Sequence, residues 1–556
     1  MRMRLSSPRS HHPPAPRPHP MHLPRISLLA AALLAAGTPL AAQHGNGHAA
    51  AAPDSARPAL LTEALGPFTW PVTTTSPEAQ AYFDQGVKLM YAYARAYARP
   101  SFAEARRLDP SCAMCWWGEA WSMGAYLNGA MVDADAPAAD AAARRARELA
   151  AANGTELERA VTEAMTARYA PSHPQGGRKG LDSAYVRAME SVYARFPDDL
   201  QVATLYADAM MLLEPRRGVW SLEKPSVARI HQVLEHGLAA DLGHSGVCHA
   251  YIHATETTPN AGRAQACADL LVTAMPGASH LNHMPSHTYN RMGRWEDAVN
   301  SNVLAVESDR RAADGQAVSI YAGHNLHMLL FAAAVDGQEA RALEAVDAWG
   351  ALTGADGASL PALVRVRFGR WDDVLPLTEA PTHAVHRGMW AFARGHAHLR
   401  LGARDSANTY LALVDSLAQN GGTAAFRGHS AEALLGILGG ILRGEMLRAD
   451  GRSDEAIAVF EAAVTREDGL QYDEPEPLPF AVRDWLGAAL LEMGRAADAE
   501  RVYRAGVEDR PHKGWSIFGL EQALRAQGKT ADADEARARF QEAWTRSRTS
   551  LTSSRF

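Results

Sequence analysis

Histidine is the residue of this sequence whose type and spacing point most clearly to chemistry. Ten of its 23 histidines lie between residues 231 and 327. The same separations recur within this stretch: 34 residues from His249 to His283 and from His253 to His287, then 44 residues from His280 to His324 and from His283 to His327. Equivalent positions of three successive structural units therefore carry histidine.

Inside each unit the spacing is helical. Residues three, four or seven apart share one face of a helix, so their side chains can act together. Three sets have this spacing: His249, His253 and Glu256; His280, His283 and His287; His324 and His327. We expect each set to project from one helix towards a common place.

Neutral imidazoles that converge with a carboxylate suit Zn, Cu(II), Fe or Ni. We therefore predict that these eight residues bind a divalent transition metal ion, with weaker candidates in Asp208 and His244. They exceed the needs of one tetrahedral ion, so a two-metal centre or open catalytic positions also fit, and a metal-dependent hydrolase or oxidase is an alternative. Two further interpretations stay open. The imidazoles could form a hydrogen-bonded polar lining, or they could donate to an acidic or peptide ligand.

A repeated pattern of small and aromatic residues indicates how the histidines are positioned. Residues with steps of 12, 4, 3 and 5 recur along the chain: Gly86, Ala98, Phe102, Ala105 and Pro110; Gly444, Ala456, Phe460, Ala463 and Asp468; Gly487, Ala499, Tyr503, Gly506 and Pro511. A small residue in one helix lets the next helix approach, an aromatic side chain fills the gap, and proline ends the unit. The pattern predicts helix hairpins.

These repeats resemble the tetratricopeptide-repeat (TPR) family over residues 79–546. The resemblance implies an all-α fold, a right-handed superhelix (α-solenoid) of about a dozen helix hairpins, and a peptide or protein partner. A protein–protein interaction scaffold whose histidine-lined groove binds no metal is therefore an alternative function. In that family the face beside a small residue such as Ser286 lines the concave groove, which places the histidine sets there. Trp117, Trp121 and His396 are further groove candidates. Residues 109–118, 249–256, 283–289 and 514–519 also resemble a largely uncharacterised group of exported bacterial TPR proteins.

The N-terminus has the features of an export signal. Arg25 precedes a short apolar run at residues 26–36, and small residues follow at 40–42. We therefore expect a signal peptide at residues 1–42, with Met21 as an alternative start, and a periplasmic or secreted protein. A flexible lead-in at 43–76, a solenoid at 77–546 and a polar tail at 547–556 complete the predicted organisation.

Composition excludes some functions. A formal charge of −7 argues against nucleic-acid binding, and no apolar run after residue 45 is long enough to predict a transmembrane segment in the mature chain.

Four cysteines can pair in an oxidising compartment. Cys112 and Cys115 form a C-x-x-C without the histidine of a haem motif, and Cys248 and Cys267 can be bridged if they lie on neighbouring helices.

Overall fold

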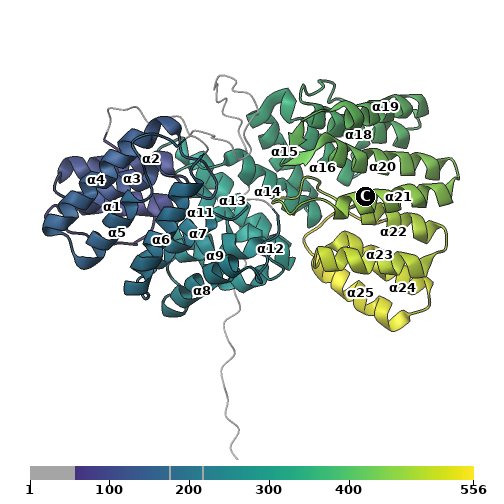
Figure 1. The fold of residues 1–556 in the computed structure, drawn as a ribbon. Coiled ribbons are helices and arrows are strands. Elements are labelled where there is room, and N and C mark those ends of the chain that lie inside the picture. Colours follow the sequence, from purple (N-terminus) through teal and green to yellow (C-terminus); the bar gives the residue numbers. More distant parts are fainter. Residues whose placement is uncertain (1–56, 175–176, 216–217) are drawn as a thin grey trace, which may run out of the picture. The chain divides into compact units, whose positions relative to one another are not determined.

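The computed structural model describes residues 57–174, 177–215 and 218–556 (Figure 1). The predicted signal peptide and residues 43–56 of the predicted lead-in lie outside this part of the chain.

Helices make up nearly all the regular secondary structure of the described residues. The first part contains α1 (Pro77–Tyr91), α2 (Arg95–Leu108), α3 (Ala113–Met123), η1 (Asp133–Asp135), α4 (Ala136–Asn153), α5 (Glu156–Thr166), α6 (Lys179–Arg195), α7 (Leu200–Met211) and α8 (Pro225–Ala240). The middle part contains α9 (Ser245–Glu256), η2 (Ala261–Ala264), α10 (Gln265–Ala274), α11 (Ser279–His283), α12 (Pro285–Met292), α13 (Trp295–Ala312), α14 (Ala322–Val335), α15 (Glu339–Thr353), η3 (Gly354–Gly357) and α16 (Ser359–Arg367).

The last part continues in the same way. It contains α17 (Trp371–Val374), α18 (Ala384–Arg400), α19 (Arg404–Asn420), the antiparallel pair β1 (Ala425–Phe426) and β2 (His429–Ser430), α20 (Ala431–Ala449), α21 (Ser453–Asp468), α22 (Val482–Glu492), α23 (Ala496–Asp509), α24 (Gly514–Ala526) and α25 (Thr530–Ala543).

The repeated glycines and aromatic residues pack as the spacing predicts. Phe102 of α2 is fully buried between Gly86 of α1 and Gly118 of α3; a Cβ at these glycines would lie 2.5 Å and 2.3 Å from its ring. Tyr503 of α23 lies in the same way between Gly487 and Gly519, at 2.4 Å and 2.2 Å. Only glycine leaves room for these rings, so the pattern fixes how closely successive helices approach.

Most helices pack against the next helix along the chain, and several also contact the next but one, as α1 does with α3 and α18 with α20. Contacts between sequence neighbours define a solenoid, because each unit is stabilised by the units beside it. The predicted all-α, TPR-like solenoid is therefore confirmed. In the part of the chain that the structure describes, no helix has the length and apolar character needed to cross a bilayer.

Both segments that flank the helices are packed onto them. In residues 57–76, expected to be flexible, Trp70 is 7% exposed, and its backbone N–H donates to Asp84 of α1. In the predicted polar tail, the Ser554 hydroxyl donates to the Asp484 carbonyl, and the Arg555 guanidinium pairs with Glu445. The prediction missed this packing because it treated polar and Pro-rich composition as evidence of mobility.

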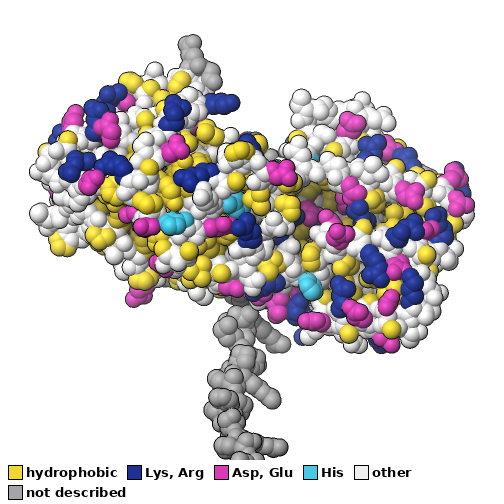
Figure 2. All heavy atoms as spheres, turned by 60° about the horizontal axis from the view of Figure 1, so that its bottom comes forward, with side chains coloured by type: hydrophobic (Ala, Val, Ile, Leu, Met, Phe, Trp, Pro, Cys, Tyr) yellow, Lys and Arg dark blue, Asp and Glu magenta, His cyan; other side chains and the backbone are white. Residues whose placement is uncertain are grey.

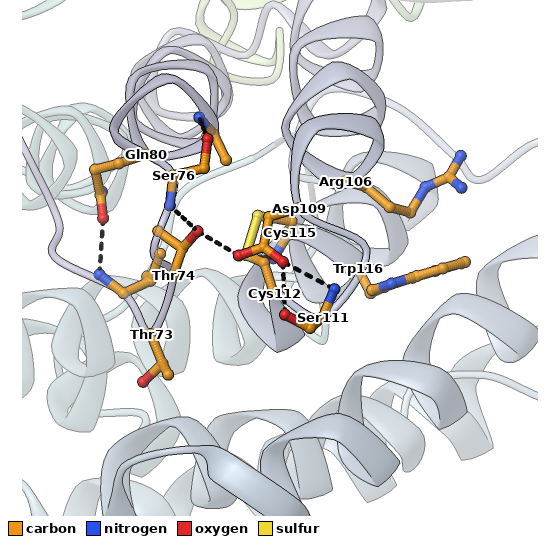
Figure 3. The surroundings of a disulfide bond; sticks show 12 residues. Thr73, Thr74, Ser76, Gln80, Arg106, Asp109, Ser111, Cys112, Cys115 and Trp116 are labelled. Atoms are coloured by element: carbon orange, nitrogen blue, oxygen red, sulfur yellow. Dashed lines mark hydrogen bonds between the residues drawn. A yellow bond between two sulfur atoms is a disulfide. The ribbon is translucent and has the colours of Figure 1, made fainter.

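All four cysteines are paired. Cys248 of α9 bonds Cys267 of α10, which joins two neighbouring helices as the spacing allowed. Cys112 bonds Cys115 at the start of α3, where Figure 3 shows Asp109 accepting hydrogen bonds from Ser111. Both cysteines of this second pair are fully buried, so their role is to hold the beginning of α3.

Candidate metal centre

Four helices bring the predicted histidines together. His249 and His253 lie on α9, His280 and His283 on α11, and His287 on α12. His324 lies on α14. Pro285 lacks the backbone N–H of a helix interior, which separates α11 from α12 while Met284 stays helical in its backbone angles. The side chains of His280, His283 and His287 therefore still follow one helix face.

The first group of imidazoles consists of His249, His253 and His280, and we call it trio 1. One ligand nitrogen from each ring lies within 4.8 Å of the others, and all three residues are buried. The His249 ring is 4.8 Å from that of His253 and 5.1 Å from that of His280, centroid to centroid. Nitrogens around a tetrahedral ion are about 3.3 Å apart, so small side-chain rotations would close trio 1 on one ion.

Hydrogen bonds orient the nitrogens of trio 1. His249 Nδ1 lies 2.5 Å from the Tyr91 carbonyl, which can only accept, so Nδ1 carries the proton. Its Nε2 then has a lone pair and, among the described residues, no hydrogen-bond partner. His280 is 2% exposed, and neither of its ring nitrogens has such a partner. A backbone carbonyl that fixes the tautomer is typical of metal-binding histidines.

The second group, trio 2, consists of His283, His287 and His324, whose ligand nitrogens also lie within 4.8 Å of one another. His283 Nδ1 donates to Asn302 Oδ1 of α13 at 2.8 Å, because the amide nitrogen of Asn302 is engaged with the Ala298 carbonyl. The His283 Nε2 lone pair therefore points at His287 Nε2, 2.8 Å away. In trio 2, as in trio 1, a hydrogen bond to one ring nitrogen fixes the orientation of the ring, here through Asn302 and His283.

Two carboxylates complete the centre. Glu256 Oε1 lies 3.0 Å from His253 Nδ1, and its Oε2 lies 2.6 Å from His287 Nδ1. Glu474, which was not among the predicted ligands, also contacts His287 Nδ1. Glu256, His287 and Glu474 form a third possible ligand group.

The segment between α21 and α22 carries Glu474 into the centre, and an ion pair holds this segment in place. Arg427, in the turn between β1 and β2, donates to both carboxylate oxygens of Asp473 at 2.6 Å and 2.8 Å. Arg427 also donates to the Glu474 carbonyl. Arg427 and Asp473 have side chains only 1% and 6% exposed. We call this pair the Arg427–Asp473 clasp.

Burial controls protonation in the centre. It lowers the pKa values of His249, His280 and His283 well below the ordinary histidine value, so these rings are neutral. Burial also disfavours a charged His287, but the carboxylates of Glu474 and Glu256 outweigh it and raise the pKa of His287 to about 10. Neutral imidazoles are the form that ligates metal ions.

Strained backbone surrounds the trios. Of the four described non-glycine residues with positive φ, three lie around this centre: Tyr93 (56°), Tyr321 (59°) and Arg427 of the clasp (53°). The Tyr93 ring stacks on His253 and His280, and the Tyr321 ring meets His280 edge-on at 5.1 Å. Strain of this kind persists where the surrounding structure over-determines it, commonly at functional sites.

The space between the trios is small. A cavity of about 50 Å³ is lined by His253, His280, His287, Tyr321, Tyr472 and Glu474, among others. This volume holds only a few water-sized molecules. The prediction that the histidines line an open concave groove is therefore wrong. Because the segment before α22 and the tyrosines cover them, no peptide could reach them without displacing these parts.

Three predicted ligands lie outside all three ligand groups. His327 follows His324 by three residues, but its ring packs against Trp349 and Phe426 instead. His244 caps α9: its Nδ1 accepts from the Val247 N–H and its Nε2 contacts Gln201. Asp208 lies near Arg168 and Arg95, whose charges only partly offset its burial, and its pKa rises to about 6.

The predicted groove residues belong to the packed interior. Trp117 is fully buried and Trp121 is 5% exposed; their rings meet at 5.1 Å, and Trp117 also contacts Trp70. His396 is buried and stacks on Trp371, far along the chain from the trios. Neither of its ring nitrogens has a hydrogen-bond partner among the described residues, yet it belongs to no ligand group. Large aromatic side chains commonly fill helix interfaces, and these do.

Comparisons with known proteins add little about function. No family model and no curated protein matches the chain. Among solved structures, the chain is similar to one in the crystal structure of the APC/C hetero-tetramer Cut9–Hcn1, with 12% identity, 84% of this chain and 73% of the other covered, and a TM-score of 0.28. It is also similar to one in the structure of Naa15/Naa10 bound to HypK-THB, with 12% identity, 84% and 70% covered, and a TM-score of 0.22.

The fold and the site together define a helical-hairpin solenoid with a buried centre of imidazoles and carboxylates. On the face drawn in Figure 2, basic and acidic side chains are interspersed.

Proposed function

We propose that this chain is an exported metal-binding protein that holds a divalent transition metal ion in trio 1. Zn, Cu, Fe and Ni all accept imidazole ligands. Three histidines would leave the fourth position of a tetrahedral ion for water or another ligand. The two disulfides support an oxidising compartment, in which such bonds persist.

The observation that carries the proposal is that both ring nitrogens of the buried His280 lack a hydrogen-bond partner among the described residues, although two other imidazoles lie beside the ring. Leaving a buried polar group without a partner costs about 1–3 kcal/mol. A bound ion would accept a His280 lone pair and remove this cost. His396 has equally unpartnered nitrogens, but its ring neighbours are Trp371, Phe392 and Phe556. His280 therefore differs from His396 as a candidate metal ligand, because it lies beside other imidazoles.

This observation also separates the proposal from its alternatives. A polar lining held together by bonds between protein groups would give each ring a protein partner, and His280 has none among the described residues. A peptide or protein partner, which the resemblance to the TPR family implies, would have to bind other surfaces, because the trios are buried.

The test is elemental analysis of protein purified without a histidine tag, followed by metal removal and titration with Co(II). We expect stoichiometric metal, and tetrahedral Co(II) absorption that falls by the equivalent of one ion per chain in the His280→Ala variant. His396→Ala is the matched control and should keep both. Should His280→Ala not fold, unfolding of the wild-type chain with and without Co(II) replaces it. Absence of metal together with unchanged unfolding in Co(II) would refute the proposal.

A further inference from the structure

Trio 2 has the features of a second metal site, although the proposed function needs only the first. Its rings are close: His283 lies 4.7 Å from His287 and 4.6 Å from His324, centroid to centroid. These three residues come from α11, α12 and α14, so helices on two sides supply them. Three imidazoles are enough to hold one tetrahedral ion with one open position.

The lone pair of His283 points into trio 2. Because Asn302 holds the proton of His283 on Nδ1, the Nε2 lone pair faces His287 Nε2 across 2.8 Å. Two nitrogens that share a tetrahedral ion lie about 3.3 Å apart. An ion between them would therefore need a shift of roughly half an ångström. The carboxylates behind His287 Nδ1 would orient that ring in the manner of carboxylate–histidine–metal arrangements.

Trio 2 also adjoins trio 1 directly. The ring of His280 stacks on that of His283 at 5.7 Å, and His253 lies 6.1 Å from His287. Glu256 contacts His253 with one carboxylate oxygen and His287 with the other. Two divalent ions at this separation would repel one another in a buried site, and the buried charges of Glu256 and Glu474 would offset that repulsion.

We propose that trio 1 and trio 2 each bind one metal ion, so that the chain carries a dinuclear centre joined by Glu256. The cavity of about 50 Å³ lies between the two trios and is lined by members of both. Its size suits a ligand of two or three atoms. The centre therefore binds a small molecule such as water, dioxygen or a triatomic anion at the open metal positions.

The inference rests on the proposed function, and metal counting in variants separates the two. We expect two Co(II) ions per chain in the loaded wild-type protein, and one in His324→Ala, which leaves trio 1 intact. His327→Gln is the matched control on the same helix and should keep two. Azide should shift the Co(II) spectrum of the wild-type protein, because it fits the cavity.

Each other outcome has a definite meaning. One ion per chain, lost in His280→Ala and kept in His324→Ala, would overturn the second site and leave the proposed function standing. A second ion lost in Glu474→Gln but kept in His324→Ala would overturn the assignment to trio 2 in favour of Glu256, His287 and Glu474. If His324→Ala does not fold, stepwise Co(II) titration of the wild-type chain decides the count: saturation at one ion contradicts the proposal.

Discussion

The Arg427–Asp473 clasp provides a sharp test of how the centre is assembled. Its two hydrogen bonds join side chains that are 1% and 6% exposed, so the pair is fully buried. Removing one partner of a buried ion pair leaves an uncompensated charge and costs about 3–5 kcal/mol. We choose Arg427→Asn because asparagine tolerates the positive φ of this position, so the loss reports the ion pair and not backbone strain.

The matched control is Arg452→Asn. Arg452 pairs with Glu455 on the same helical turn, but their side chains are 55% and 58% exposed. Exposed pairs of this kind contribute little to stability, because solvent screens them. Urea unfolding should therefore separate the two variants by several kcal/mol, with the greater loss in Arg427→Asn.

The clasp should also affect metal binding at a distance. Without it, the segment that carries Glu474 is no longer held, and the orientation of His287 relaxes. Loss of such supporting contacts typically weakens metal affinity about 10–100-fold. Competition between the protein and a chromophoric chelator for Co(II) measures this change. Equal stability and equal affinity in Arg427→Asn and Arg452→Asn would refute the reasoning.

Two further predictions concern the solenoid. Phe460 is fully buried against Gly444, so Phe460→Ala should lower the free energy of unfolding by about 3–5 kcal/mol, measured in urea; a loss below about 1 kcal/mol would contradict the packing. The pKa of Asp208 is raised to about 6 from 3.8. Below pH 4 this carboxyl is protonated in both the folded and the unfolded chain, and between pH 4 and pH 6 only the unfolded chain releases the proton. The free energy of unfolding therefore falls as the pH rises from 4 to 6. Because the carboxylate is half-buried, this fall is about 2 kcal/mol, and it should be absent in Asp208→Asn when unfolding at pH 4 and pH 7 is compared.

The sequence predicted much of the centre because its geometry is local. A separation of one repeat places His249 and His283 at equivalent points of successive hairpins, and their side chains then face the same interior. His327 departs from this pattern, because its ring packs against Trp349 and Phe426 and not against the other imidazoles.

The rest could not be read from spacing. Glu474 lies 187 residues after His287, and no local pattern encodes a contact between such distant segments. The stretch around Glu474 is acidic and Pro-rich, a composition typical of connecting segments. Trp117 and Trp121 had helical spacing that suits either a groove or a core, and only packing against Trp70 and Tyr91 decides between them. His396 likewise shows that histidine on a helix face can be enclosed by aromatic rings.

Because Glu474 lies far after the histidines in the sequence, it is synthesised after them, and this order has a consequence for how the protein matures. During synthesis, the helices from α9 to α14 are made long before the segment that covers them. Until that segment is made, Tyr472 and Glu474 cannot cover the imidazoles beside them. Metal affinity and folding are coupled in metal sites, so the proposed ion can bind before this segment covers the histidines. Proteolysis before α22 would leave a chain with an uncovered histidine surface that binds metal ions with little selectivity.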